Sequence, residues 1–187
     1  MTETTHTTTP PSTLPLVPGR WTLDAAHSTV SFSVRHLGIS KVRGVFHDFT
    51  AELIVGDDLA TSLVTATIES ASIDTGNPDR DAHVRSAELL DVASRPTLVF
   101  RSTRIEGGGD EWKVTGDLTI GDVTGQVSLD VELGGIETYP IDGSIHAGFS
   151  ATGAISRKEL GVRFGPLDAA LGDTVRIELD LQLVEPR

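Results

Sequence analysis

The stretch Val175-Arg-Ile-Glu-Leu-Asp-Leu-Gln-Leu183 alternates strictly between aliphatic and polar residues. Successive side chains of a β-strand point to opposite faces, so this period of two predicts a strand with one buried face and one solvated face. Such two-faced strands are typical of antiparallel sheets, because parallel sheets are usually buried on both sides. The stretch therefore predicts an antiparallel sheet.

The same alternation recurs along most of the chain from Trp21 onward. It predicts about eight or nine strands, at residues 21–23, 30–36, 41–55, 63–72, 97–105, 112–120, 126–133, 143–155 and 175–183. The third of these is either one long strand or a bent pair, with Gly44 as a candidate bulge. Because long strands in this number would expose their edges unless the sheet closes, an all-β barrel is predicted. A β-sandwich with shorter strands is the competing architecture.

Residues Ser72 to Val92 interrupt the alternation and predict a short helix. Asn77 is a suitable N-cap, and Pro78 suits the first helical position, where its missing N–H costs nothing. Acidic residues follow in the first turn, where the helix dipole favours negative charge. We expect this helix to end near Asp91. A short, ion-rich helix in a β chain is interpreted as an element that plugs or gates something.

The composition narrows the class of protein. A length of 187 residues suits one domain. The net charge of −12 argues against a nucleic-acid binder and against electrostatic docking on an anionic membrane. The chain has no cysteine, which excludes disulfides, thiolate nucleophiles and Cys-ligated metals. Since no apolar run approaches 18 residues, no membrane-spanning helix is predicted.

The first 18 residues are rich in Thr and Pro and show neither helical nor strand periodicity. Such a segment buries too little apolar surface to offset its ordering entropy. We expect residues 1–18 to be a disordered leader and residues 19–187 to be a single domain. The leader lacks the basic start and apolar core of a signal peptide, so cytoplasmic residence is the expectation.

The histidines after the leader allow two interpretations; they are His27, His36, His47, His83 and His146. In the first, His36 and His47 meet across a hairpin and bind zinc together with a carboxylate. In the second, each histidine is satisfied by its own hydrogen bond, because no two share a metal-ligand spacing on one element. No strong catalytic motif is present either, so the chain is predicted not to be an enzyme and to need no cofactor.

The charged residues of the predicted helix also allow two interpretations. Arg80, His83 and Arg85 could anchor an anionic or polar head group, with arginine as a bidentate donor. Alternatively they belong to a solvated ion-pair face, because Asp81 and Arg85 are four residues apart. Spacing alone favours the ion-pair face.

Several aromatic residues fall on faces predicted to point inward: Phe32, Phe46 or Phe49, Phe100 and Trp112. Aromatic residues make up only 5% of the chain, and small residues are abundant. A solidly packed barrel of this length would need more bulk, so an unfilled apolar tunnel is predicted. Burial of each methylene contributes about 0.8 kcal/mol, so a long lipid would fill such a tunnel favourably.

A set of motifs across residues 20–184 resembles the YceI-like family, whose members are known as polyisoprenoid-binding proteins with a lipocalin-like barrel. The motifs are Trp21-Thr-Leu-Asp24 with His27-Ser28; Val30, Phe32, Val34 and His36; Val42, Gly44 and Phe46; Ser72-Ile-Asp-Thr-Gly76; Arg80-Asp81, His83 and Arg85-Ser86; Pro96, Phe100 and Ser102; Gly116, Leu118-Thr-Ile120 and Val123-Thr124; Arg157 and Gly161; and Gly172-Asp173. The combination from Ser72 to Ser86 is the most specific of these.

The resemblance implies an eight-stranded antiparallel lipocalin-like barrel with one or two short helices around a long apolar pore. It implies an isoprenoid or other long-chain amphiphile as ligand, such as an isoprenoid quinone or a polyprenyl phosphate, and a possible homodimer. The residues expected to line the pore are Phe32, Val34, His36, Phe46, Ile68, Phe100, Leu118, Ile120 and Ile177. Those expected near the head group are Arg80, His83 and Arg85.

The chain departs from the family in three places. Many family members carry a cleaved leader for the periplasm, whereas this chain has only the Thr/Pro segment. A turn that is commonly basic is Gly121-Asp-Val-Thr-Gly-Gln126 here, and the family's Arg-x-x-Phe-Gly is replaced by Arg157-Lys-Glu-Leu-Gly161. Two further functions stay open from the sequence: a metal-assisted enzyme that uses barrel histidines, and an interaction protein without a ligand.

Overall fold

The computed structural model describes residues 13–187, and a single sheet holds more than half of them. Its strands are β1 Gly19–Leu23, β2 Thr29–His36, β3 Ser40–Phe46, β4 Phe49–Val55, β5 Leu63–Glu69, β6 Ile73–Asp74, β7 Thr97–Gly108, β8 Glu111–Ile120, β9 Val123–Thr138, β10 Ile145–Ser156 and β11 Leu171–Val184. The α-helix is α1, Pro78–Arg85, and 3₁₀ helices cover Ala25–His27, Leu59–Thr61, Ser70–Ser72 and Gly165–Ala170.

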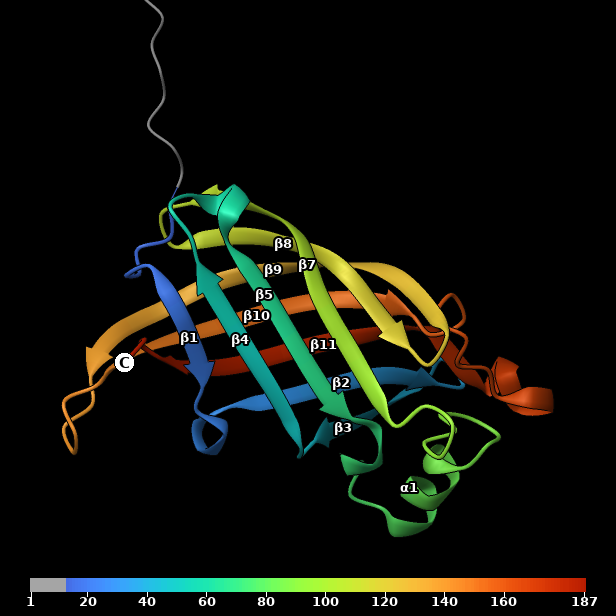
Figure 1. Cartoon of the computed structure of the whole chain (residues 1–187). Coiled ribbons are helices and arrows are strands. Elements are labelled where there is room, and N and C mark those ends of the chain that lie inside the picture. Colours follow the sequence, from blue (N-terminus) through green and yellow to red (C-terminus); the bar gives the residue numbers. More distant parts are fainter. Residues whose placement is uncertain (1–12) are drawn as a thin grey trace, which may run out of the picture.

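The antiparallel sheet closes on itself (Figure 1). β1 is hydrogen-bonded to β4 on one side and to β11 on the other, which completes a ring in the order β1-β4-β5-β7-β8-β9-β10-β11. This confirms the predicted eight-stranded antiparallel barrel over the competing sandwich. β2, β3 and β6 continue the sheet from β11 beyond the point where the ring closes.

Residues 41–55 fold as the bent pair of the two predicted alternatives, because β3 ends at Phe46 and β4 begins at Phe49. β1 and β2 follow each other in the same way, and both pair with β11 along different parts of its length. Past these bends, β3 pairs with β2 and, at its last residues, with the two-residue strand β6. Within the described chain, residues 40–44 of β3 therefore have no strand on their other side. The barrel wall is incomplete there, at the end where α1 lies (Figure 1).

The predicted bulge at Gly44 is wrong. The pairing of β2 with β3 runs without interruption from Val30 to His36, and Gly44 lies opposite Phe32. A Cβ on Gly44 would lie 2.5 Å from Cζ of Phe32 and 2.9 Å from the carbonyl O of Asp74. The glycine is thus needed for a close approach of the Phe32 ring rather than for a bend, and register shifts occur instead in β7, β10 and β11.

We expect Gly44→Ala to lower the free energy of unfolding by about 1–3 kcal/mol, because the added methyl group overpacks against Phe32 and a backbone carbonyl. Chemical denaturation monitored by circular dichroism would measure the change. Gly108→Ala is the matched control, since nothing lies within 4 Å of a Cβ built on Gly108. An equal loss in both variants would contradict the explanation.

Helix α1 begins as the sequence predicts, with the Asn77 side chain accepting a hydrogen bond from the backbone N–H of Arg80 at 3.0 Å. It ends earlier than predicted, at Arg85 instead of near Asp91. The hydroxyl of Ser86 donates to the carbonyl O of His83 at 2.7 Å, and such local side-chain bonds compete with a continuing helix. The following residues form turns. Within the described part of the chain, no helix is both long and apolar enough to cross a membrane.

Part of the segment before β1 packs against the barrel. Leu14 and Leu16 are each 9% exposed, and the indole Nε1 of Trp21 donates to the carbonyl O of Val17 at 2.9 Å. The predicted leader therefore divides into residues 13–18, which pack against the barrel, and residues 1–12, which lie outside the described residues.

Candidate ligand cavity

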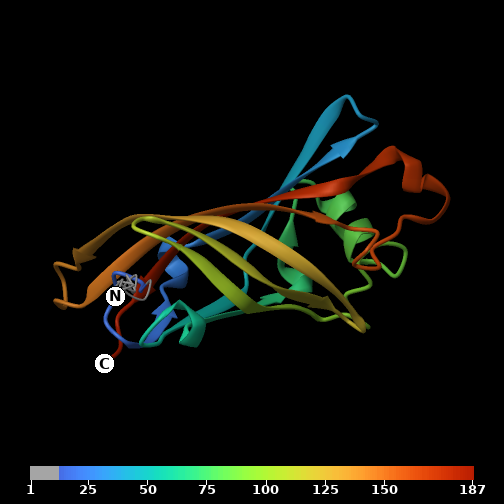
Figure 2. The same ribbon diagram turned by 90° about the horizontal axis from the view of Figure 1, so that it is seen from above.

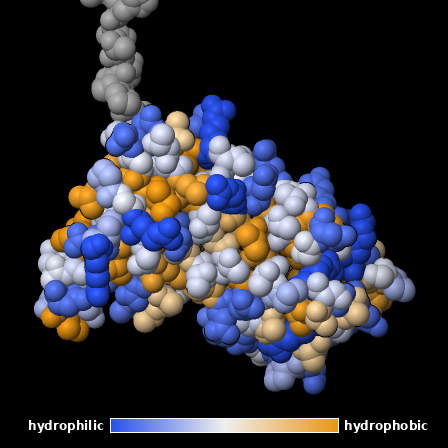
Figure 3. Space-filling model, in the orientation of Figure 1, coloured by the Kyte–Doolittle hydropathy of each residue, from blue (hydrophilic) through white to orange (hydrophobic). Residues whose placement is uncertain are grey.

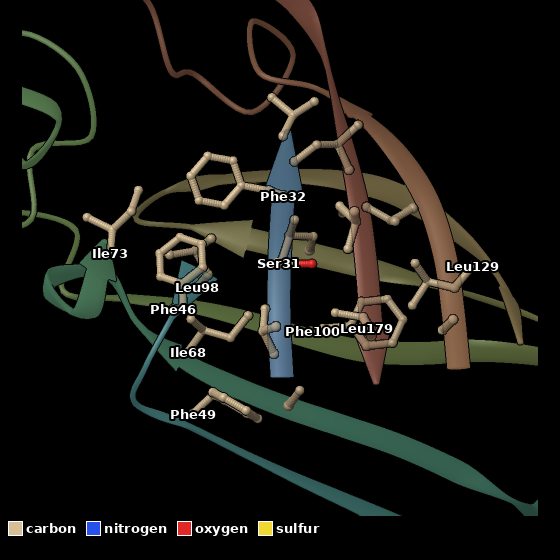
Figure 4. A pocket seen from close by; sticks show the side chains of 18 of the residues that line it. Ser31, Phe32, Phe46, Phe49, Ile68, Ile73, Leu98, Phe100, Leu129 and Leu179 are labelled. Carbon is tan, nitrogen blue, oxygen red and sulfur yellow. The ribbon is translucent and has the colours of Figure 1, made fainter. Parts of the chain in front are cut away.

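The barrel encloses a cavity of about 670 Å³, within the range of about 300–1,000 Å³ typical of small-molecule sites. Figure 4 shows that Phe32, Phe46, Ile68, Leu98 and Phe100 point from β2, β3, β5 and β7 toward this shared interior. They do so because alternate residues of each strand face inward. The interior is therefore an elongated apolar space and not a solid core.

All of the residues expected to line the pore lie on the cavity wall; these are Phe32, Val34, His36, Phe46, Ile68, Phe100, Leu118, Ile120 and Ile177. They come from six strands of the sheet: β2, β3, β5, β7, β8 and β11. Alternate residues of a strand share one face, so these side chains face the cavity. Their contact with a ligand is part of the proposal below.

Two small side chains leave room in the middle of the wall. Ala51 of β4 lies directly opposite Ala66 of β5, and both line the cavity. Gly116 of β8 allows an aromatic ring to approach the backbone closely, as Gly44 does. A Cβ on Gly116 would lie 2.6 Å from the ring of Phe100. Small residues opposite aromatic rings keep the rings against the wall, so space remains along the axis.

Polar side chains gather at one end of the cavity, which we call the mouth: His36, Thr75, Asp79, Arg80 and His83. The mouth lies at the end of the barrel where residues 40–44 of β3 have no strand on their other side, and α1 lies at the same end (Figure 1). A second, smaller pocket of about 410 Å³ adjoins it and shares some of its wall; it is lined by His36, Ser40, Lys41, Val42, Arg43, Thr75 and Arg80. The apolar cavity thus continues into a polar space on the side of the incomplete wall.

The segment around α1 contributes both apolar and polar groups to this end. Val84, Leu89 and Leu90 line the cavity, and the two leucines are buried. These contacts place the α1 region against one end of the cavity. Leu89 and Leu90 lie in the turns after α1 and not in the helix itself.

Arg80 is held at the mouth by Thr75. Its Nε donates to the Thr75 hydroxyl at 2.7 Å, and its Nη2 donates to the Thr75 carbonyl O at 2.8 Å. Thr75 in turn donates to the buried Asp81 carboxylate through its hydroxyl, at 2.6 Å, and through its backbone N–H, at 2.9 Å. Asp81 thereby fixes Thr75, and Thr75 fixes Arg80. Within residues 13–187, Nη1 of Arg80 has no acceptor, so it is available to a ligand.

The predicted ion pair between Asp81 and Arg85 is wrong, because both side chains are engaged elsewhere. Arg85 donates to the carbonyl O atoms of Ala71 and Ile73, and it is not part of the cavity wall. Arg85 therefore joins the helix to the strand before it, and we leave it out of the proposed head-group contacts. This role of Arg85 could not be predicted from the sequence, because the spacing of side chains does not show which backbone carbonyl groups lie nearby.

His83 lies at the mouth and contacts two other side chains. Its Nε2 is 2.8 Å from the Glu88 carboxylate, and its ring centroid lies 5.0 Å from that of Phe164. Phe164 also lines the cavity. The imidazole therefore joins the segment after β10 to the α1 region across the end of the barrel.

Arg157 also lies at this end of the cavity, and its burial and hydrogen bonds were not predicted from the sequence. It is 3% exposed and lines the cavity. Its guanidinium donates to Asp168 and to the carbonyl O atoms of Val162, Asp168, Leu171 and Gly172. With its donors used by the chain itself, Arg157 fixes the connection between β10 and β11 and is not a ligand contact.

Asp168 gives this connection a pH dependence. Hydrogen bonds from Arg157, from Lys158 and from the backbone N–H of Phe164 hold the pKa of the Asp168 carboxyl well below its usual range. A lowered pKa stabilises the folded state above the ordinary aspartate pKa of about 3.9, and that contribution is lost as pH falls below it.

We therefore expect the melting temperature of Asp168→Asn to fall less steeply than that of the unmodified protein between pH 5 and pH 2. At pH 7 the variant should be the less stable of the two. Circular dichroism melts across this range would measure both slopes. Asp122→Asn, at an exposed turn position, is the control and should leave the slope unchanged. Parallel curves for Asp168→Asn and the unmodified protein would contradict this explanation.

The structure contradicts a metal site between His36 and His47. In the β2–β3 hairpin, His36 pairs with Ser40 near the turn, whereas His47 lies beyond the other end of β3. His47 contacts Asp74 at 3.0 Å instead. Among residues 13–187, no group of three or more His, Asp or Glu side chains is arranged to hold a metal ion.

A closed antiparallel barrel with an apolar internal cavity and a polar mouth defines a class of lipocalin-like barrel proteins. Residues 21–183 match the YceI-like domain, so the chain belongs to the YceI-like family. A UPF0312 protein of Staphylococcus aureus is 38% identical over 146 residues, which cover 77% of this chain and 82% of that protein. Protein YceI of Escherichia coli O157:H7 is 35% identical over 158 residues, covering 83% and 82% of the two chains.

Solved structures show the same fold. The YceI protein of Campylobacter jejuni superposes with a TM-score of 0.72 at 30% identity, over 88% of this chain and 97% of the other. BcnA of Burkholderia cenocepacia gives a TM-score of 0.74 at 24% identity, over 86% and 98%. A polyisoprenoid binding domain from Saccharophagus degradans gives 0.63 at 15% identity, over 89% and 98%.

Proposed function

We propose that this protein binds one isoprenoid or other long-chain amphiphile, with the apolar chain inside the barrel and the head group at the mouth. The observation that carries the proposal is the cavity of about 670 Å³ with an apolar wall and polar side chains gathered at one end. Such a division matches a molecule with a long apolar tail and one polar end. At about 0.8 kcal/mol per buried methylene, the tail supplies most of the affinity.

The comparisons support the chemical class of the ligand. The chain belongs to the YceI-like family, and a domain of the same fold from Saccharophagus degradans is described as polyisoprenoid binding. Isoprenoid quinones and polyprenyl phosphates are the two head-group types that we propose first. Carriage, storage or protection of such a lipid is the proposed role, and binding rather than catalysis is the proposed activity.

Arg80 and His36 are the proposed polar contacts, with His83 beside them. Nη1 of Arg80 has no acceptor within residues 13–187 and the side chain lines both pockets, so it is placed to donate to a phosphate or a quinone oxygen. His36 lines both pockets as well. The pore contacts are the nine wall residues named above.

Lipid extraction from protein purified out of its native host tests the proposal. We expect mass spectrometry of the extract to find an isoprenoid or another long-chain amphiphile at a level comparable with the protein. Delipidated protein would then be offered a polyprenyl phosphate, an isoprenoid quinone and a saturated fatty acid separately, which identifies the head group and the chain. A protein that is empty on isolation and takes up none of the three would overturn the proposal. Light scattering on the same samples tests the homodimer that the family resemblance implies.

A further inference from the structure

The tip of the β2–β3 hairpin, residues 37–39, exposes two large apolar side chains. Leu37 is 59% exposed and Ile39 is 83% exposed. Leu37 also has a φ of 52°, in the left-handed region that asparagine, aspartate and glycine adopt more readily. A polar residue would suit both the backbone and the solvent better at this position. Leucine is therefore unfavourable here for folding, which points to a function of the tip.

Leu167 adds a third exposed apolar side chain at the same end of the barrel. It is 59% exposed and lies in the 3₁₀ helix Gly165–Ala170. The backbone N–H of Leu37 donates to the carbonyl O of Ala170 at 2.7 Å, so the hairpin tip and this segment are joined. Figure 2 shows the blue hairpin and the red-orange segment projecting from the end of the barrel that carries α1. The exposed apolar tips thus flank the mouth.

The strands below these tips carry an uncompensated positive charge. Arg35 and Lys41 lie opposite each other on the outer face of the hairpin, Arg43 is two residues further along, and Arg176 of β11 lies beside the same face. All four are exposed, and none forms an ion pair with another described residue of the chain. No Asp or Glu occurs from Thr29 to His47, in a chain with a net charge of −12. Glu178 is the acidic residue that follows on β11.

The hairpin tip at the opposite end of the barrel differs from this one. The face in Figure 3 mixes hydrophilic and hydrophobic residues, as soluble surfaces commonly do. Ile141, at the opposite end of the barrel, is 80% exposed and precedes Asp142 in a tip that also follows Glu137. Ile141 thus lies next to acidic residues, whereas residues 29–47, which carry Leu37 and Ile39, contain no Asp or Glu.

We propose that the mouth end docks on the surface of an anionic phospholipid bilayer. Leu37, Ile39 and Leu167 enter the interfacial region, while the arginine and lysine side chains lie along them and reach the lipid phosphates. A second copy of the chain is a poorer match, because three side chains on two loops fall far short of the roughly 800 Å² per partner of a stable protein interface. Docking in this position places the cavity beside the membrane, where long-chain lipids reside.

The overall negative charge does not prevent such docking. Charges are screened over about 8 Å at physiological ionic strength. The 14 residues of β11 span about 45 Å, so carboxylates at the far end lie several screening lengths from the docked surface. Near Leu167, the Asp168 carboxylate is paired with Arg157 and Lys158, and the Asp173 carboxylate accepts from Ser156 and from the backbone N–H of Lys158. We therefore assign the interaction at contact to the unpaired cations of the hairpin. This inference goes beyond lipid binding in the cavity, and vesicle binding tests it whether or not the cavity is occupied.

Sedimentation of the full chain with vesicles tests the inference. We expect binding to vesicles of phosphatidylcholine and phosphatidylglycerol at 7:3 to be at least about tenfold tighter than to phosphatidylcholine alone, and to weaken with salt. Leu37→Asn combined with Ile39→Ser should weaken binding to the anionic vesicles at least about tenfold. Lys41→Gln combined with Arg43→Gln should remove most of the preference for the anionic lipid.

Two control variants match these changes at other places. Ile141→Ser removes an equally exposed isoleucine at the opposite end, and Arg104→Gln combined with Lys113→Gln removes two exposed cations from β7 and β8. Both should bind vesicles as the unmodified protein does. Ile39→Trp adds a fluorescent reporter, whose emission should be quenched by brominated lipids.

The inference is overturned if the unmodified protein does not distinguish the two vesicle types or if the hairpin-tip variant binds as well as the unmodified protein. It is also overturned if the tip variant abolishes a dimer in light scattering while no vesicle binding is seen. Uptake of lipid from detergent solution should be the same in the tip variant and the unmodified protein. Normal uptake with lost docking therefore separates this inference from the proposed function.

Discussion

Ala66→Trp is expected to abolish stable retention of a long-chain lipid while the barrel remains folded. Ala66 lines the cavity and lies opposite Ala51, so an indole at this position enters space that a lipid chain would occupy. If it displaces about three methylenes at about 0.8 kcal/mol each, affinity falls by roughly 50-fold. Competition with a fluorescent fatty acid analogue would measure the loss.

Thr67→Trp is the matched control for this change. Thr67 lies one position further along β5, pairs with Val99 and is not part of the cavity wall. The same side chain on the outer face should leave affinity within about twofold, since aromatic residues are well tolerated in strands. Equal loss in both variants would show that the effect is on folding, and unchanged binding in Ala66→Trp would place the ligand outside the barrel.

Arg157→Met is expected to cause the largest loss of stability among single substitutions at the mouth end. Removal of the guanidinium takes one of the donors from the Asp168 carboxylate and the guanidinium donor from four carbonyl O atoms. Breaking one partner out of a buried pair typically costs about 3–5 kcal/mol. For a chain of this length that corresponds to a melting temperature lower by roughly 10 °C.

Arg163→Met controls for the loss of one positive charge in the same segment, because Arg163 is exposed. Its melting temperature should stay within about 2 °C of the unmodified protein, as expected of a surface substitution. A shift of similar size in both variants would contradict the role assigned to Arg157. Asp168→Asn should cost less stability than Arg157→Met at pH 7, since Arg157 then keeps its hydrogen bonds to four carbonyl O atoms.

The strand pattern made the barrel predictable, and the alternation together with the family resemblance supplied nine residues that line the cavity. This succeeded because the period of two reports which face of the sheet a side chain occupies, wherever the strand ends. The break between β3 and β4 was harder to predict, since inward residues continue on both sides of it at Phe46 and Phe49. Gly44 was misread for a related reason, because the need for a glycine came from the Phe32 ring across the hairpin.

The polar residues of the mouth were less predictable than the wall. Spacing on a helix suggested that Asp81 pairs with Arg85, but the fold supplies stronger partners in Thr75 and in the carbonyl groups before α1. Those partners are fixed only once β6 and α1 are placed. The charge of the hairpin was hidden in the same way, because a net charge is an average and says nothing of where the cations gather.

Native mass spectrometry tests the central claim most directly. Delipidated protein would be mixed with an isoprenoid lipid and sprayed intact, beside Ala66→Trp and Thr67→Trp. The account predicts one lipid per chain for the unmodified protein and for Thr67→Trp, and a free chain for Ala66→Trp. Equal lipid occupancy in all three proteins, or a free chain in all three, would contradict a ligand held inside the barrel.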